Sequence, residues 1–84
     1  MERLVILVRE RDNVAVALRD ISAGSAVVLP DGRQIVAATN VPESHKMAIV
    51  ALGAGAAVIK YGEVIGQAAK DIAQGEWVHT HNLT

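Results

Sequence analysis

Asp20-Ile21-Ser22-Ala23-Gly24-Ser25-Ala26-Val27 is the stretch that decides the fold, because the chain repeats it as Asp71-Ile72-Ala73-Gln74-Gly75-Glu76-Trp77-Val78. A weaker copy reads Ala51-Leu52-Gly53-Ala54-Gly55-Ala56-Ala57-Val58. Each copy has an aliphatic residue, two linking residues, a Gly, two further residues and a Val. Because Gly adopts positive φ without strain, we expect the aliphatic residue to enter the core, the chain to turn at the Gly, and a strand to begin at the Val.

The copies are separated by 31 and then 20 residues. This unequal spacing excludes a solenoid array and predicts a small barrel or clip made of related β-turn-β units. With 84 residues the chain forms one domain, residues 1–84. It has no Phe, one Trp and one Tyr, so Val, Ile, Leu and Ala must build the core, a composition that favours short strands.

The net charge of −1 argues against a nucleic-acid or anionic-membrane surface, since both need a basic excess. The absence of Cys excludes disulfides, thiolate metal sites and Cys nucleophiles. No apolar run approaches the roughly 20 residues that span a bilayer. The N-terminal residues lack the organisation of a signal peptide, so we expect a cytoplasmic location.

The rest of the chain predicts a mainly β fold with at most short helical turns. Pro30-Asp31-Gly32-Arg33 has the composition of a hairpin turn. A short helix or 3₁₀ turn over residues 66–73 is the helical alternative, since Ala68, Ala69 and Ile72 have helical spacing. Strands are predicted at residues 4–8, 14–18, 34–38 and 76–81. Further strands are predicted after the turn within residues 19–29, at the loop end that carries His45 and Lys46, and on either side of a Gly-bounded turn within residues 58–66.

Two groups of residues could carry chemistry. His79 and His81 lie two apart on the predicted last strand, so both side chains would share one face and could bind a divalent metal or an anionic substrate. The alternative is an exposed, solvated strand end. A catalytic metal usually has three protein ligands, so a third would have to come from His45, a partner chain or another part of the protein.

His45 and Lys46 follow a turn-rich approach at the entry to a strand, where scaffolds often hold working residues. They could act as a base and an electrostatic clamp for a carboxylate-bearing substrate; the alternative is a loop His beside a solvated Lys. Taken alone, Lys60 and Tyr61 are more typical of side-chain packing than of a catalytic pair, and Trp77 is typical of a residue that covers the core. Asp12-Asn13 is typical of a turn.

Together these motifs resemble the N-terminal SAF (β-clip) domain of altronate dehydratase and of the wider group that holds galactarate dehydratase and the small subunit of sulfolactate sulfo-lyase. The His-Thr-His-Asn ending is more similar to altronate dehydratase than to galactarate dehydratase. The sequence departs from the family pattern at Ser44, where a Gly often precedes the His. The motifs are Asp12-Asn13-Val14-Ala15-Val16-Ala17, His45-Lys46-Met47-Ala48, residues 58–66, Asp71-Ile72-Ala73-Gln74-Gly75-Glu76 and Val78-His79-Thr80-His81-Asn82.

The resemblance implies part of a lyase that removes water from altronate to give 2-keto-3-deoxygluconate, with a divalent metal, Fe²⁺ or else Mn²⁺, bound mostly by a main catalytic body that this chain lacks. It implies catalytic roles for His45 and Lys46 and a place near the metal for His79 and His81. It also implies substrate binding by Asp12, Asn13, Lys60 and Tyr61. The expected partners are the main catalytic domain or large subunit, the sugar acid and further copies of the chain, and the domain alone is expected to be inactive.

Three rival hypotheses remain. The chain could be the free-standing small subunit of sulfolactate sulfo-lyase, a dimerising module with idle histidines, or a sugar-acid binding domain that acts on its own.

Overall fold

The computed structural model describes residues 4–7 and 9–84, and all its regular elements are strands. The mainly β prediction is therefore confirmed, and the described residues contain no helical turn. None of them belongs to a helix long and apolar enough to cross a membrane. The strands are β1 (Val5–Ile6), β2 (Val14–Ala17), β3 (Ala26–Val28), β4 (Gln34–Val36), β5 (Lys46–Ala48), β6 (Ala57–Lys60), β7 (Glu63–Gln67) and β8 (Trp77–Val78).

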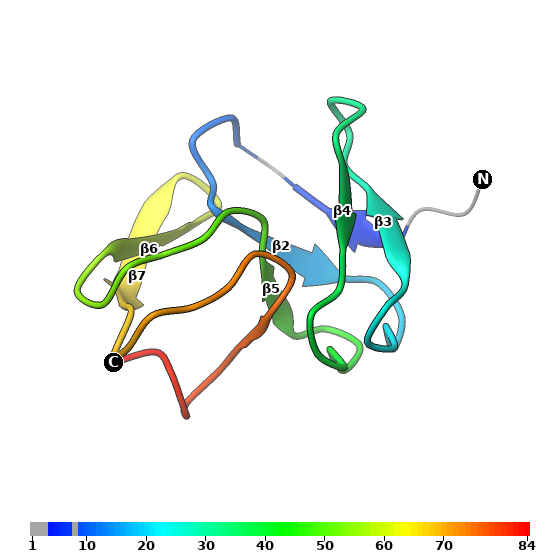
Figure 1. Ribbon diagram of the computed structural model, residues 1–84. Coiled ribbons are helices and arrows are strands. Elements are labelled where there is room, and N and C mark those ends of the chain that lie inside the picture. Colours follow the sequence, from blue (N-terminus) through cyan, green and yellow to red (C-terminus); the bar gives the residue numbers. More distant parts are fainter. Residues whose placement is uncertain (1–3, 8) are drawn as a thin grey trace.

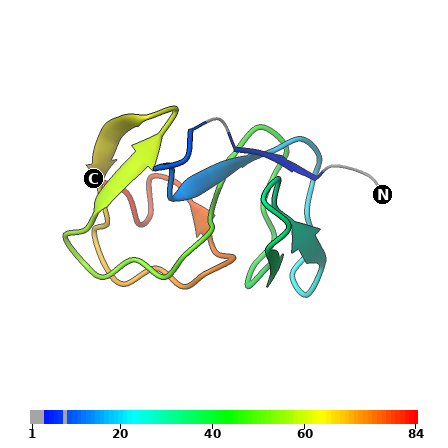
Figure 2. The same cartoon turned by 90° about the horizontal axis from the view of Figure 1, so that it is seen from above.

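A four-stranded sheet in the order β1-β2-β5-β8 forms the centre, and all its neighbouring strands are antiparallel. The hairpins β3–β4 and β6–β7 are separate two-stranded sheets on either side of it (Figure 1). The sheets do not join into a closed barrel. Seen from above, the same three parts follow one another along the molecule (Figure 2).

The molecule consists of two similar halves, residues 17–47 and 48–78, related by a shift of 31 positions. In the first half the bridge Ile21↔Val41 joins two turn units, and in the second half the bridge Leu52↔Ile72 does the same. Both bridges have paired backbone hydrogen bonds of 2.8 Å. The hairpins share a register at their open ends, where Ala26 pairs with Val36 and Ala57 with Gln67, but a β-bulge next to Val58 shifts the register of β6–β7 towards its turn.

The bridge at Val41 begins a further copy of the repeat, which the sequence pattern did not predict. Residues 41–47 follow the same course as the copies that begin at Ile21, Leu52 and Ile72. The residue at the turn is a Gly in those three copies, with φ between 85° and 90°, whereas here it is Ser44, with φ of 71°. The missing Gly concealed this copy from a search by sequence.

The two faces of the central sheet pack against two separate cores. Met47 belongs to the first core and its neighbour Ala48 to the second, because successive side chains of a strand point to opposite faces. Trp77 packs against the first core and Val78 is part of the second. The central sheet is thus buried on both faces, which accounts for its apolar sequence. The residues of the second core are Val14, Ala48, Leu52, Val58, Ala68, Ile72 and Val78.

Several predicted strands are longer than those observed. The strand predicted at 4–8 is limited to β1, and Val8 lies outside the described residues. The strand predicted at 76–81 ends at Val78, and residues 79–82 form a bend and turn. The helical alternative at 66–73 is wrong, because Gly66 and Gln67 belong to β7 and Ala68 bridges Leu83.

Candidate functional site

The pairing of β5 with β8 brings His45 and His79 together. Lys46 lies opposite Val78 and Met47 opposite Trp77, so the same register places His45, just before β5, opposite His79, just after β8. Their ring centroids are 4.7 Å apart. The two histidines, 34 positions apart in the sequence, therefore meet at one end of the central sheet.

Trp77 connects these histidines into one group. Its indole Nε1 donates a hydrogen bond of 3.1 Å to Nδ1 of His45. Its ring stacks on His79 at 5.4 Å with an interplanar angle of 10°, and its centroid is 5.1 Å from that of His81. We call His45, Trp77, His79 and His81 the imidazole–indole cluster. Trp77 thus contacts all three histidines of the site, in addition to covering the first core as the sequence predicted.

The hydrogen bond from Trp77 sets the tautomer of His45. An indole N–H can only donate, so Nδ1 of His45 must carry a lone pair. The neutral imidazole therefore has its proton on Nε2, which becomes a hydrogen-bond donor for any ligand. In this arrangement His45 is suited to donate to an oxygen atom, whereas the predicted role as a base would require Nδ1 to leave Trp77.

The surroundings of His79 favour its neutral form. Partial desolvation lowers the pKa of His79, and the charges of His45, Lys46 and His81 lower it further. His79 is half-buried and His81 is exposed. The cluster therefore holds one imidazole whose surroundings disfavour charge beside another that is open to solvent.

A buried amide holds the turn that carries His79 and His81. The side chain of Asn82 is fully buried. Its Oδ1 accepts a hydrogen bond of 2.9 Å from the backbone N–H of His79, and its Nδ2 donates one of 2.9 Å to the backbone carbonyl of Trp77. Nδ2 also lies 3.4 Å from Oε2 of Glu76. This role of Asn82 was not predicted from the sequence, where the only signal for it was the polar side chain that ends His-Thr-His-Asn.

Lys46 and Lys60 form a second cationic feature. Lys46 is half-buried, and desolvation lowers its pKa, as does the nearby positive charge of Lys60. The Lys60 amine lies 5.0 Å from the ring centroid of Tyr61. The strand alternation directs Lys46 to the face opposite Met47, away from the side that carries Trp77. The structure thus separates Lys46 from its neighbour His45, although the charge of Lys46 still acts on His79.

Asp12 and Asn13 fasten the hairpin that carries Lys60 and Tyr61. Asp12 is buried, and its Oδ1 accepts a 2.7 Å hydrogen bond from the N–H of Gly62. Asn13 accepts one of 2.7 Å from the N–H of Ile59 and donates one of 2.9 Å to the carbonyl of Ala57. These bonds give both side chains a structural role, and their predicted contact with substrate stays a prediction.

The described residues include no group of three His, Asp or Glu side chains arranged to hold a metal ion. Nδ1 of His45 is already occupied by Trp77, which leaves the cluster short of a third donor. Within residues 4–7 and 9–84, the side chains therefore do not by themselves provide the roughly three protein ligands that a catalytic metal needs.

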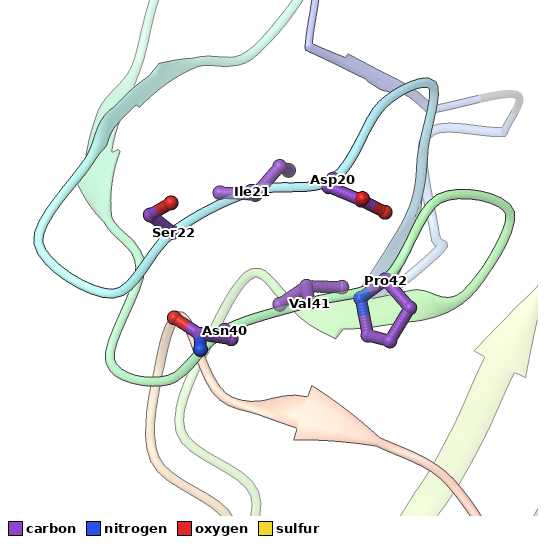
Figure 3. Close-up of a pocket in the computed structure, with 6 residues that line it drawn as sticks. All are labelled: Asp20, Ile21, Ser22, Asn40, Val41 and Pro42. Carbon is purple, nitrogen blue, oxygen red and sulfur yellow. The ribbon is translucent and has the colours of Figure 1, made fainter.

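A groove of about 270 Å³ lies between the paired segments of the first half (Figure 3). Asp20, Ile21 and Ser22 line one side, facing Asn40, Val41 and Pro42. The Asp20 carboxylate already accepts a bond from the N–H of Glu43, and Asn40 accepts one from that of Ala23. The polar lining is thus used to hold the two turns, and the imidazole–indole cluster remains the stronger candidate site.

Residues 3–84 match the family described as the altronate/galactarate dehydratase SAF domain. The chain belongs to this SAF domain family. It is 44% identical over 77 residues to altronate dehydratase of Escherichia coli K12, a match that covers 92% of the chain and 15% of that protein. It is 36% identical over 73 residues to galactarate dehydratase (L-threo-forming) of the same organism, covering 87% of the chain and 14% of that protein.

The SAF domain is also similar to a much shorter protein, the subunit alpha of (2R)-sulfolactate sulfo-lyase from Paracoccus pantotrophus. The identity is 47% over 49 residues, covering 58% of the SAF domain and 73% of that subunit. The chain spans about a seventh of the length of the dehydratases that it matches. The predicted resemblance to this family is confirmed.

Proposed function

We propose that this SAF domain forms part of a cytoplasmic hydro-lyase that converts altronate to 2-keto-3-deoxygluconate and water. The observation that carries the proposal is the imidazole–indole cluster, in which His45, His79 and His81 gather around Trp77. The 44% identity to an altronate dehydratase supports altronate as the sugar acid. The shared family supports dehydration as the reaction.

Dehydration of a sugar acid breaks a C–H bond beside the carboxylate and a C–O bond on the next carbon. The resulting enol then rearranges to the 2-keto acid. Negative charge builds up on the carboxylate as the proton leaves, and nearby donors and cations stabilise it. We assign to His45 the donation of its Nε2–H to a substrate oxygen, and to Lys46 an electrostatic effect on the carboxylate. Asp12, Asn13, Lys60 and Tyr61 are proposed to face the substrate or to hold the residues that do.

The main catalytic body, as a further domain or a large subunit, is the partner that this proposal requires. Since the described residues lack three metal donors, a divalent ion such as Fe²⁺ or Mn²⁺ would be held mostly by that body, with His79 and His81 close to it. The SAF domain alone is then inactive. Assembly of further copies into a homo-oligomer belongs to the same proposal.

The test is turnover of altronate by the intact enzyme carrying His45→Ala or His79→Ala. We expect His45→Ala to lose about 100-fold in kcat, the usual range for a positioned proton donor, and His79→Ala to lose about 10- to 100-fold because it removes a side chain proposed to lie close to the metal. Trp77→Phe keeps the aromatic ring but removes the N–H bonded to His45, and it should lower kcat by about tenfold with little change in KM. Lys70→Ala, an exposed cation outside the cluster, is the control. Full activity of both His variants would remove the cluster from the site.

The alternative function is the small subunit of (2R)-sulfolactate sulfo-lyase. It is favoured by one observation, the match that covers 73% of a subunit of comparable size. An intact native mass near 8.9 kDa together with activity on sulfolactate and none on altronate would establish it. If the domain can be deleted with loss of stability alone, it is a structural module instead. Affinity of the isolated chain for aldonates would indicate a binding domain.

A further inference from the structure

The β6–β7 hairpin has an apolar surface that the rest of the described chain leaves uncovered. Val64 and Ile65 of β7 are 57% and 41% exposed, and Tyr61 at the hairpin turn is 47% exposed. The equivalent hairpin β3–β4 has one such side chain, Val36, which is 58% exposed. Val64 and Ile65 are neighbours on a strand and point to opposite faces, so an occupant that contacts both must lie along the edge of the hairpin.

The outer edge of β7 also has free backbone groups. Lys60 and Glu63 close the two-residue turn Tyr61-Gly62, so they form the first hydrogen-bonded pair of the hairpin. By the alternation of an antiparallel ladder, Val64 then directs its N–H and carbonyl away from β6. Outside the β6–β7 ladder, no described residue donates or accepts a backbone hydrogen bond at these two groups. An unpaired edge with apolar side chains is a template for a further strand.

The far end of this edge already accepts such a strand. Thr84 exchanges two backbone hydrogen bonds with Gln67, of 2.9 and 3.0 Å, and Leu83 bridges Ala68 in an antiparallel sense. Gly66 makes this approach feasible, because a Cβ there would collide with the carbonyl oxygen of Thr84 and lie 3.0 Å from Cδ1 of Leu83. Both ribbon views show the C-terminus beside β7 (Figures 1 and 2).

We propose that the outer edge of β7 at residues 63–65 binds an extended strand of the main catalytic body, with apolar side chains that cover Val64 and Ile65. The inference rests on the proposed function, which places a large body next to this domain. The dehydratases that match the chain are several times longer than it, so in them the equivalent domain is joined to a large remainder that can supply the strand. The new strand would continue the antiparallel direction of Leu83 and Thr84.

A second copy of the SAF domain fits this edge less well. The Gln67 end is already occupied by Thr84, which leaves only residues 63–65 for pairing between two copies. A two-stranded contact of about three residues each is shorter than an ordinary strand and far below a stable interface. A large body can supply both the strand and a surface around it.

The experiment compares amide hydrogen exchange in the 84-residue chain and in the intact enzyme, as one polypeptide or with its large subunit. We expect the Val64 amide to exchange about tenfold or more slowly in the intact enzyme, because pairing protects it. The amides of β4 should exchange at equal rates in both forms. Equally fast exchange at Val64 would overturn the proposal. Slow exchange of the Val64 amide in the 84-residue chain alone would also overturn the proposal. If that slow exchange depends on protein concentration, the occupant of the edge is a second copy of the chain.

Matched variants test the side chains. Val64→Asp in the intact enzyme should abolish the protection of the amide at position 64 and increase cleavage between the domain and the body by added protease. Val36→Asp is the control, since Val36 is 58% exposed on the equivalent hairpin and should change neither result. Protection in an enzyme that does not convert altronate would contradict the proposed substrate only. Turnover of altronate without protection at Val64 would contradict this surface only.

Discussion

The two halves of the SAF domain share one backbone plan but place different side chains at equivalent positions. Ser44, His45 and Lys46 of the first half correspond to Gly75, Glu76 and Trp77 of the second. β5 and β8, which carry or adjoin these residues, pair with each other in the central sheet. The imidazole–indole cluster therefore forms where the halves meet and takes residues from both. The repeated scaffold provides the geometry, and the differences between the copies provide the chemistry.

The turn units are also held in different ways. Asn40 in the first half and Asp71 in the second accept equivalent bonds from the N–H groups of Ala23 and Ala54. Asp20 accepts a bond from Glu43, but its counterpart in the second half is Ala51, which has no acceptor. There, Oε1 of Glu76 accepts a 2.8 Å bond from the N–H of Ala73 instead. The second half thus replaces a bond between segments with a local one.

Of the substitutions in the two halves, Gly75→Ala should reduce the stability of the fold most. A Cβ at Gly75 would collide with the carbonyl of Val36 and lie 2.9 Å from the backbone nitrogen of Ala38, at a φ of 85°. We expect a loss of about 3 kcal/mol or more in the free energy of unfolding, measured by urea denaturation. Gly55→Ala is the equivalent control with φ of 88° and open space around it, and should cost about 1 kcal/mol. Equal losses would show that backbone conformation alone matters.

Asn82→Ala should have the next largest effect. Removal of the buried amide leaves the N–H of His79 and the carbonyl of Trp77 without their partner, at a cost of about 2 kcal/mol in unfolding free energy. The imidazole NMR signals of His79 and His81 should shift as the turn loosens. Thr80→Ala, at an exposed position of the same turn, should stay within about 0.5 kcal/mol. Unchanged signals in Asn82→Ala would show that the cluster holds the turn without this amide.

Ser44→Gly should make the two halves more alike and produce the smallest effect. Ser44 adopts a φ of 71°, which is costly for a residue with a Cβ and free of strain for Gly. The gain, reduced by the greater freedom of Gly in the unfolded chain, should be about 0.5 kcal/mol. Ser22→Gly, at an exposed position without a positive φ, should destabilise by a similar amount. A loss of stability in Ser44→Gly would mean that the Ser side chain contributes more than the strain costs.

Much of the fold could be predicted from local pattern. The Gly-centred copies at Gly24, Gly55 and Gly75 predicted β-turn-β units, and positive φ at all three confirms the physical reason. The copy with Ser44 was missed because a Ser rarely signals positive φ. The last strand was predicted too long, because Asn82 draws the N–H of His79 into a turn after Val78. A competing side-chain bond of this kind leaves no periodic signal.

Composition, spacing and motif were enough to predict the family, the mainly β class, an aliphatic core and the histidines that could carry chemistry. Which of those residues meet depends on the folded arrangement of the strands. The register of β5 against β8 placed His45 beside His79 and Trp77, and the strand alternation directed Lys46 to the other face. The fold also places the side chains of Asp12 and Asn13 in hydrogen bonds with the backbone of the β6–β7 hairpin. Such contacts join residues more than 30 positions apart, and strand register, which local sequence does not encode, sets which side chains share a face.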